Sequence, residues 1–71
     1  MKTDLKITLF NKHGHFLASI EYTKDSTPLQ AMTELKHELD TGTGIWFKQL
    51  NPKSIMLEFP NKEDNPVLIT K

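Results

Sequence analysis

Histidine side chains are gathered at one predicted turn and recur once in the middle of the chain. His13 and His15 are separated by Gly14, while His37 stands further on with Asp40 close behind it. Two imidazoles in a turn can chelate a transition metal, and a carboxylate can assist them. However, no third ligand stands at a spacing typical of a metal motif, and histidine and glycine are common in turns. We therefore expect solvated turn histidines, with no metal and no cofactor.

Groups able to act as general acids or bases are scattered along the chain. Glu21, His37 and Glu58 are the candidates, but none stands beside a nucleophile motif, a metal signature or a phosphate-binding loop. The run from Thr41 to Gly44 resembles a phosphate cradle, yet it follows a predicted helix, where the helix dipole repels anions. A domain of this size also has little volume for a water-excluding pocket. We expect that the chain is not an enzyme.

Aromatic, aliphatic and lysine side chains alternate in segments that have the period of strands. If these segments are strands, one set shares the sheet face away from the helix: Lys6, Thr8, Phe10, Leu17, Ser19, Trp46, Lys48, Leu50 and Met56. An apolar surface rimmed by lysines is typical of an interface, and a large aromatic residue often dominates binding. The candidate partner-binding residues are therefore Lys6, Phe10, Trp46, Lys48, Leu50 and Met56. The alternative is that the C-terminal segment covers part of this face and that Trp46 is structural.

The same face has a second interpretation, as a surface for single-stranded nucleic acid. Phe10 and Trp46 would stack on bases while Lys6 and Lys48 contact phosphates. Composition argues against it, because nine acidic residues balance nine basic ones and all nine basic residues are lysine. Arginine supplies the bidentate fork for phosphate and guanine, and its absence would be unusual in a nucleic-acid reader.

Length and composition limit the chain to one small domain. A chain of 71 residues has room for a single core, and the absence of cysteine excludes disulfides and thiolate chemistry. The first residues lack the apolar segment of a signal peptide, and the longest apolar runs are triplets. We expect a cytoplasmic protein with no membrane contact.

One amphipathic helix is predicted from Thr27 to Asp40. Thr27 suits the N-cap, Pro28 the first helical position, and Gln30 completes a capping box, while Gly42 suits the left-handed position after the last turn. The expected buried side consists of Leu29, Met32, Leu35 and Leu39.

Two hairpins are expected, one on each side of this helix. In the first, Leu5, Ile7 and Leu9 share a face with the set Phe16, Ala18, Ile20 and Tyr22 across a tight turn near His13. In the second, Ile45 and Phe47 lie opposite Phe59 and Leu57, with residues 51–53 as the loop. Residues 60–71 then form a loop that ends in a short strand from Val67 to Thr70.

The order strand, strand, helix, strand, strand predicts a single α+β domain over residues 1–71, with one helix on a four-stranded mixed sheet, or five-stranded with Val67–Thr70. Its layout resembles the β-grasp fold of ubiquitin-like proteins and small bacterial immunoglobulin-binding domains, and the stretch with Gly44, Trp46, Lys53, Ile55 and Leu57 is similar to the second hairpin of the latter. The resemblance implies that the first and last main strands are central neighbours. A split ββαββ sheet with another strand order is the alternative.

The functional expectation follows from the exposed face and from the lack of a chemical motif. We expect a small intracellular interaction or regulatory module that binds a protein partner, or itself, through the open sheet face or a strand edge. The binding activity of the immunoglobulin-binding domains is not implied, because the helix has no matching recognition residues.

Overall fold

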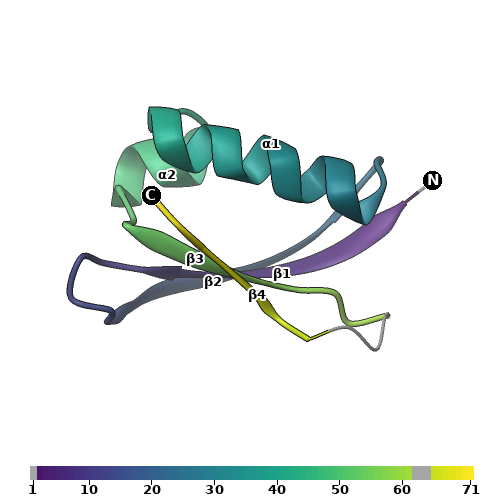
Figure 1. Ribbon diagram of the computed structural model, residues 1–71, viewed down its shortest axis with the longest axis horizontal. Helices are drawn as coiled ribbons and strands as arrows, with labels where there is room; N and C mark the ends of the chain where they lie inside the picture. Colours follow the sequence, from purple (N-terminus) through teal and green to yellow (C-terminus); the bar gives the residue numbers. More distant parts are fainter. Residues whose placement is uncertain (1, 62–64) are drawn as a thin grey trace.

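A four-stranded antiparallel sheet forms one layer of the molecule, and two helices cover one of its faces (Figure 1). The computed structural model describes residues 2–61 and 65–71. The strands are β1 (Thr3–Phe10), β2 (Phe16–Lys24), β3 (Ser54–Glu58) and β4 (Val67–Thr70), and the helices are α1 (Pro28–Thr41) and α2 (Ile45–Leu50). The strand order in the sheet is β2-β1-β3-β4.

The ends of α1 confirm the helix predicted from its caps. The Thr27 hydroxyl accepts a hydrogen bond from the backbone N–H of Gln30, and the Gln30 side chain accepts one from the N–H of Thr27, both at 3.2 Å. This is a complete capping box with Pro28 at the start of the helix. At the other end Gly42 adopts φ +69°, a left-handed conformation that glycine takes without steric cost.

The buried stripe of α1 differs from the predicted one at its first turn. Ala31, Leu35 and Leu39 are buried, at intervals of four residues, whereas Leu29 is 71% exposed. Leu29 lies roughly 120° around the helix from Leu35 at 3.6 residues per turn, so it leaves the sheet-facing side. The small Ala31 takes the sheet-facing position at this end.

All three strand pairings are antiparallel, so the predicted mixed sheet is wrong. The strand from Val67 to Thr70 is confirmed as β4, which pairs with β3. The β-grasp-like order is not confirmed, because the last strand lies at the sheet edge and β3 is the central neighbour of β1.

The segment from Ile45 to Leu50 forms α2, and its prediction as a strand is wrong. Gly44 precedes the helix with φ +88°, and Asn51 ends it with φ +48° while its N–H donates to the carbonyl of Phe47 at 3.0 Å. Asn51 is therefore a left-handed C-cap, and Pro52 after it cannot continue the helix. The second hairpin consequently joins β3 to β4.

A β-bulge changes which side chains of β2 face the helices. The register pairs Leu9 with Ala18 but Phe10 with Phe16, so Leu17 is the extra residue on β2. Leu17 packs against the core, and Phe16, predicted to be buried, is 64% exposed. The bulge therefore exchanges the roles expected for these two side chains.

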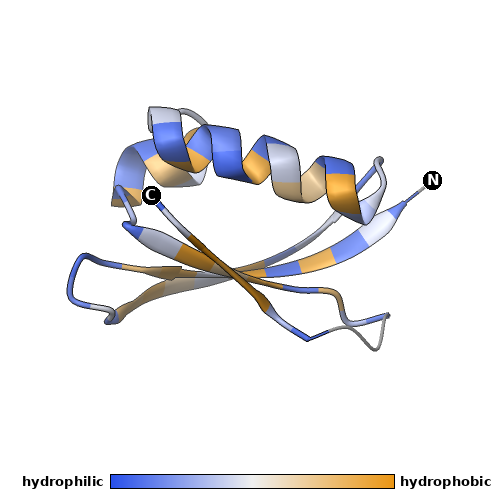
Figure 2. Ribbon diagram, in the orientation of Figure 1, coloured by the Kyte–Doolittle hydropathy of each residue, from blue (hydrophilic) through white to orange (hydrophobic). Residues whose placement is uncertain are grey.

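The core lies between the two central strands and the helices. Leu5, Ile7 and Leu9 of β1 and Ile55 and Leu57 of β3 are at most 2% exposed. They pack with the buried side chains of the other elements, which are Ala31, Leu35, Leu39, Phe47 and Phe59. Figure 2 shows hydrophobic residues along the strands where they cross beneath α1. The helix layer thus covers the sheet centre most fully and leaves β2 half-buried.

Candidate functional site

The sheet face away from α1 and α2 is covered by no helix among the described residues (Figure 1). We call it the open sheet face. On β1 it carries the side chains that alternate with the buried Leu5, Ile7 and Leu9. The register extends this face to both neighbouring strands: Thr8 lies between Ser19 of β2 and Met56 of β3, and Met56 lies opposite Leu68 of β4.

Four large apolar side chains on this face form a diagonal that crosses all four strands. Phe16 lies opposite Phe10, and Met56 lies opposite Leu68. Phe10 and Met56 are diagonal neighbours, a relation that places side chains roughly 7–8 Å apart and within reach of long ones. We call Phe10, Phe16, Met56 and Leu68 the apolar stripe. Its ends are largely exposed, at 64% for Phe16 and 65% for Leu68, and its two middle members are half-buried.

Thr8 shows how closely side chains pack at the middle of this face. It is only 8% exposed although no helix lies over it. Its cover comes from side chains of the same face, because it lies between two paired neighbours and next to the apolar stripe. The middle of the open sheet face is therefore closely packed around Thr8, beside the two half-buried members of the stripe.

Charged side chains border one side of the stripe. Lys6 lies opposite Glu21 on β2 and opposite Glu58 on β3, so acid, base and acid alternate across three strands. Beyond this row Asp4 accepts hydrogen bonds from Thr23 at 2.6 Å and from Asn61. An apolar centre with a polar rim is the usual composition of a protein interface.

The structure divides the predicted partner-binding residues between two sides of the sheet. Lys6, Phe10 and Met56 lie on the open sheet face as expected. Trp46, Lys48 and Leu50 lie on α2, which packs on the opposite side through Phe47. The nucleic-acid interpretation needs Phe10, Trp46, Lys6 and Lys48 on one face. The sheet separates Phe10 and Lys6 from Trp46 and Lys48.

Sequence reasoning misses two members of the apolar stripe. The strand pattern places Phe16 in the core, because nothing in that pattern marks the bulge at Leu17. The sequence alone does not assign Leu68 to either sheet face, because its register depends on the pairing of β4 with β3. The dipeptide Asn51-Pro52 does indicate α2, because it favours the end of a helix. A helix that ends there places Trp46 outside the sheet.

Trp46 instead lies at a groove on the helix side of the sheet, which we call the β2 groove. Its volume is about 360 Å³, and it lies between β2, the second half of α1 and the start of α2. The lining residues are Ile7, Ile20, Glu21, Tyr22, Lys24, Leu35, Glu38, Gly44, Ile45, Trp46 and Phe47.

Two titrating groups in the β2 groove are perturbed. Burial raises the pKa of the Tyr22 phenol; Lys24 opposes this effect, while Glu38 and Glu34 add to it. The pKa of the Lys24 ammonium is also raised, chiefly by its hydrogen bond to Glu34. Both perturbations favour the protonated form.

The described residues of the predicted metal and acid–base sites do not lie together in the structure. The rings of His13 and His15 are 6.0 Å apart between centroids, and no group of three or more metal-binding side chains occurs among the described residues. Glu21 and Glu58 lie on strands separated by β1, while His37 is exposed on α1 on the other side of the sheet. Thr41 and Gly42 end α1, as expected for a C-cap.

Comparisons with protein-family models, with curated proteins and with solved structures find no match. The structure itself defines a small α+β domain, with one long helix packed against a four-stranded antiparallel open sheet. In the part of the chain that it describes, no helix has the length and apolar character needed to cross a membrane.

Proposed function

We propose that this chain is a small protein-interaction module whose open sheet face packs against another protein surface. The observation that supports the proposal is the apolar stripe, which crosses every strand of the described sheet without a covering element. Two sheets that pack face to face bury such side chains in a layer about 10 Å thick. The stripe supplies the apolar centre of that layer, and the Glu21–Lys6–Glu58 row supplies its rim.

A second copy of the chain is the occupant that we propose. The chain carries nine basic and nine acidic residues, so two copies approach without net repulsion. The rim carries both signs of charge, and its Lys6 can face an acidic side chain of the other copy. A domain of this size also has few other means of gaining stability, since it has no cysteine for a disulfide.

The test measures association in solution with one matched pair of variants. Leu68→Ser removes an exposed leucine from the apolar stripe, and Leu29→Ser removes a similarly exposed leucine from α1. We expect sedimentation velocity to show a dimer for the natural chain and for Leu29→Ser, and a monomer for Leu68→Ser.

Measuring association at high protein concentration shows whether even a weak dimer forms. At about 1 mM, an association free energy of about −4 kcal/mol is already visible. A natural chain that remains monomeric at this concentration would overturn the dimer. If Leu68→Ser and Leu29→Ser weakened the dimer equally, the open sheet face would not be its interface.

A further inference from the structure

The outer edge of β2 is a long strand edge that no other strand occupies among the described residues. β2 has nine residues, whereas β4 at the opposite edge has four and follows Pro66. Natural proteins protect sheet edges with short strands, prolines or charges, and β4 fits that description. The bulge in β2 lies near its start, so its edge from Ala18 onward is suited to strand addition.

The β2 groove lies beside this strand, on the helix side of the sheet. Ile20, Glu21 and Tyr22 are consecutive, so their side chains alternate between the two sheet faces, yet all three line the groove. The groove therefore reaches the backbone of β2 between Ile20 and Tyr22, since the Glu21 side chain faces Lys6 on the open sheet face. A segment paired with β2 would place every second side chain toward α1 and α2, at the mouth of the groove.

One carboxylate of the groove, that of Glu38, forms no ion pair within the described chain. Glu38 is half-buried and makes no side-chain hydrogen bond or ion pair with another described residue. Its carboxyl group lies so close to Gly44 that a Cβ added to this glycine would be 3.4 Å from Oε2 of Glu38. Lys24, the cation that lines the groove among the described residues, forms its ion pair with Glu34, although the charge of Glu38 also acts on it. The groove thus carries an excess of negative charge.

Aromatic side chains form the walls beside these carboxylates. Trp46 is 46% exposed, so one part of the indole is open to a ligand. Tyr22 of β2 is half-buried and lines the same groove. A cation over an indole face gains electrostatic attraction, and the gain increases when water is excluded.

We propose that the β2 edge and groove bind an extended basic segment of a partner protein, which pairs with β2 as an added strand and places one Lys or Arg side chain between Trp46 and Glu38. Strand addition supplies backbone hydrogen bonds, and pockets for alternate side chains supply selectivity. The segment is basic because the half-buried Glu38 forms no ion pair with another described residue, and the apolar lining accommodates the aliphatic stem of that side chain. The groove shares no residue with the apolar stripe, although Glu21 both lines the groove and belongs to the rim of the open sheet face, and the proposal does not depend on the dimer.

The test uses a fluorescein-labelled nine-residue peptide of alternating Val and Thr with one central Arg, and a second peptide with Gln at that position. We expect the Arg peptide to bind about tenfold more tightly in fluorescence anisotropy. Glu38→Gln should remove most of this preference. Asp40→Asn removes the same charge from α1 at a residue that pairs with Lys36, and it should change binding by less than about twofold.

Backbone amide exchange separates strand addition from simple cation binding. The Arg peptide should protect amides of β2, whereas N-acetylargininamide should not. Equal binding of the two peptides, or binding without protection of β2, would overturn the proposal. Leu68→Ser should leave peptide binding unchanged, so failure here is distinguishable from failure of the dimer.

Discussion

Leu29 and Leu68 are the same side chain, exposed to nearly the same extent, at 71% and 65%. Leu68 continues a surface because Met56 lies directly opposite it and Phe10 lies next on the diagonal. Leu29 is on the first turn of α1, where its neighbours Gln30 and, one turn on, Thr33 are polar and exposed. Single exposed leucines are common on protein surfaces, so the neighbours decide which of the two is an interaction residue.

The raised pKa values of Tyr22 and Lys24 predict how stability changes in alkali. Both pKa values are higher in the folded chain than the ordinary values of 10.0 and 10.5. Their contributions are therefore fully present below those values and are lost as pH rises through the folded pKa. We expect the free energy of unfolding to fall above about pH 10.

Tyr22→Phe isolates the phenol in this pH dependence. Urea unfolding at about pH 9 and about pH 11.5 should show a smaller alkaline loss in the variant, because its ring has no proton to lose. Tyr22 is the single tyrosine of the chain, so no other phenol contributes. An alkaline loss equal to that of the natural chain would mean that Tyr22 is not buried as described.

At the scale of the elements, α2 is the one that differs most from the element predicted from its local sequence. Ile45, Trp46 and Phe47 are consistent with either a strand or one helical turn, because a helix of six residues is too short for periodicity to decide. α1 was predictable because two caps and fourteen residues of pattern agree. Without α2, the pairing of β3 with β4 could not be inferred, since local pattern gives no strand partner.

Phe47 and Ile45 provide a direct test of α2. In a strand both would face the core, whereas in the helix Phe47 is 4% exposed and Ile45 is 68% exposed. Phe47→Ala should lower the free energy of unfolding by about 3–5 kcal/mol, and Ile45→Ala by less than about 0.5 kcal/mol. Urea denaturation followed by circular dichroism measures both. Equal and large losses would favour the strand.

At the scale of the whole molecule, one core joins the two central strands to both helices. The edge strands pack against this core through partly buried side chains, such as Ile20 of β2 and Val67 and Ile69 of β4. No element therefore has a separate apolar centre on which to fold alone. The expected consequence is cooperative, two-state unfolding.

This cooperativity is measurable with the single tryptophan. Trp46 fluorescence reports α2, and far-ultraviolet circular dichroism reports all helices and strands. In urea the two transitions should share one midpoint and one slope. An earlier transition in fluorescence would show that α2 detaches before the sheet unfolds.

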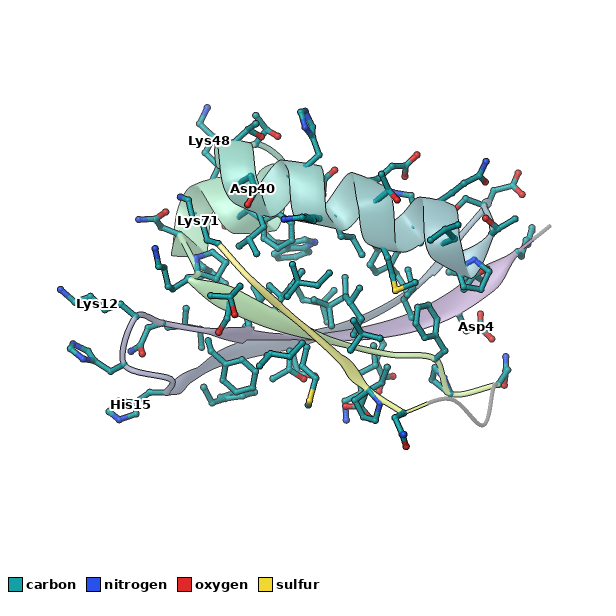
Figure 3. All side chains as sticks on the ribbon, viewed as in Figure 1. Asp4, Lys12, His15, Asp40, Lys48 and Lys71 are labelled. Atoms are coloured by element: carbon teal, nitrogen blue, oxygen red, sulfur yellow. The ribbon has the colours of Figure 1, made fainter. Side chains whose placement is uncertain are left out.

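The net charge of the chain is zero, but the charged side chains are not spread evenly over its surface. Lys12, Lys53 and Lys71 line a hollow of about 690 Å³ with His13, and no acidic side chain lines it among the described residues. Figure 3 shows Lys12, Lys48 and Lys71 toward one end of the molecule, where Asp40 also lies, with Asp4 toward the other end. Net charge was predictable from composition, but this basic hollow was not, because it depends on which turns and chain segments meet.

The bulge at Leu17 also affects how the first hairpin tolerates changes of length. Residues 11–15 form a turn in which the Asn11 side chain accepts hydrogen bonds from the N–H groups of His13 and His15 at 2.8 and 3.0 Å. The bulge leaves Leu17 as the unpaired residue beside this turn. Thr3 to Leu9 therefore stay in continuous register with Lys24 to Ala18. The hairpin tip is thus a natural insertion point for a tag or spacer, because residues added there leave the pairing of the two strands unchanged.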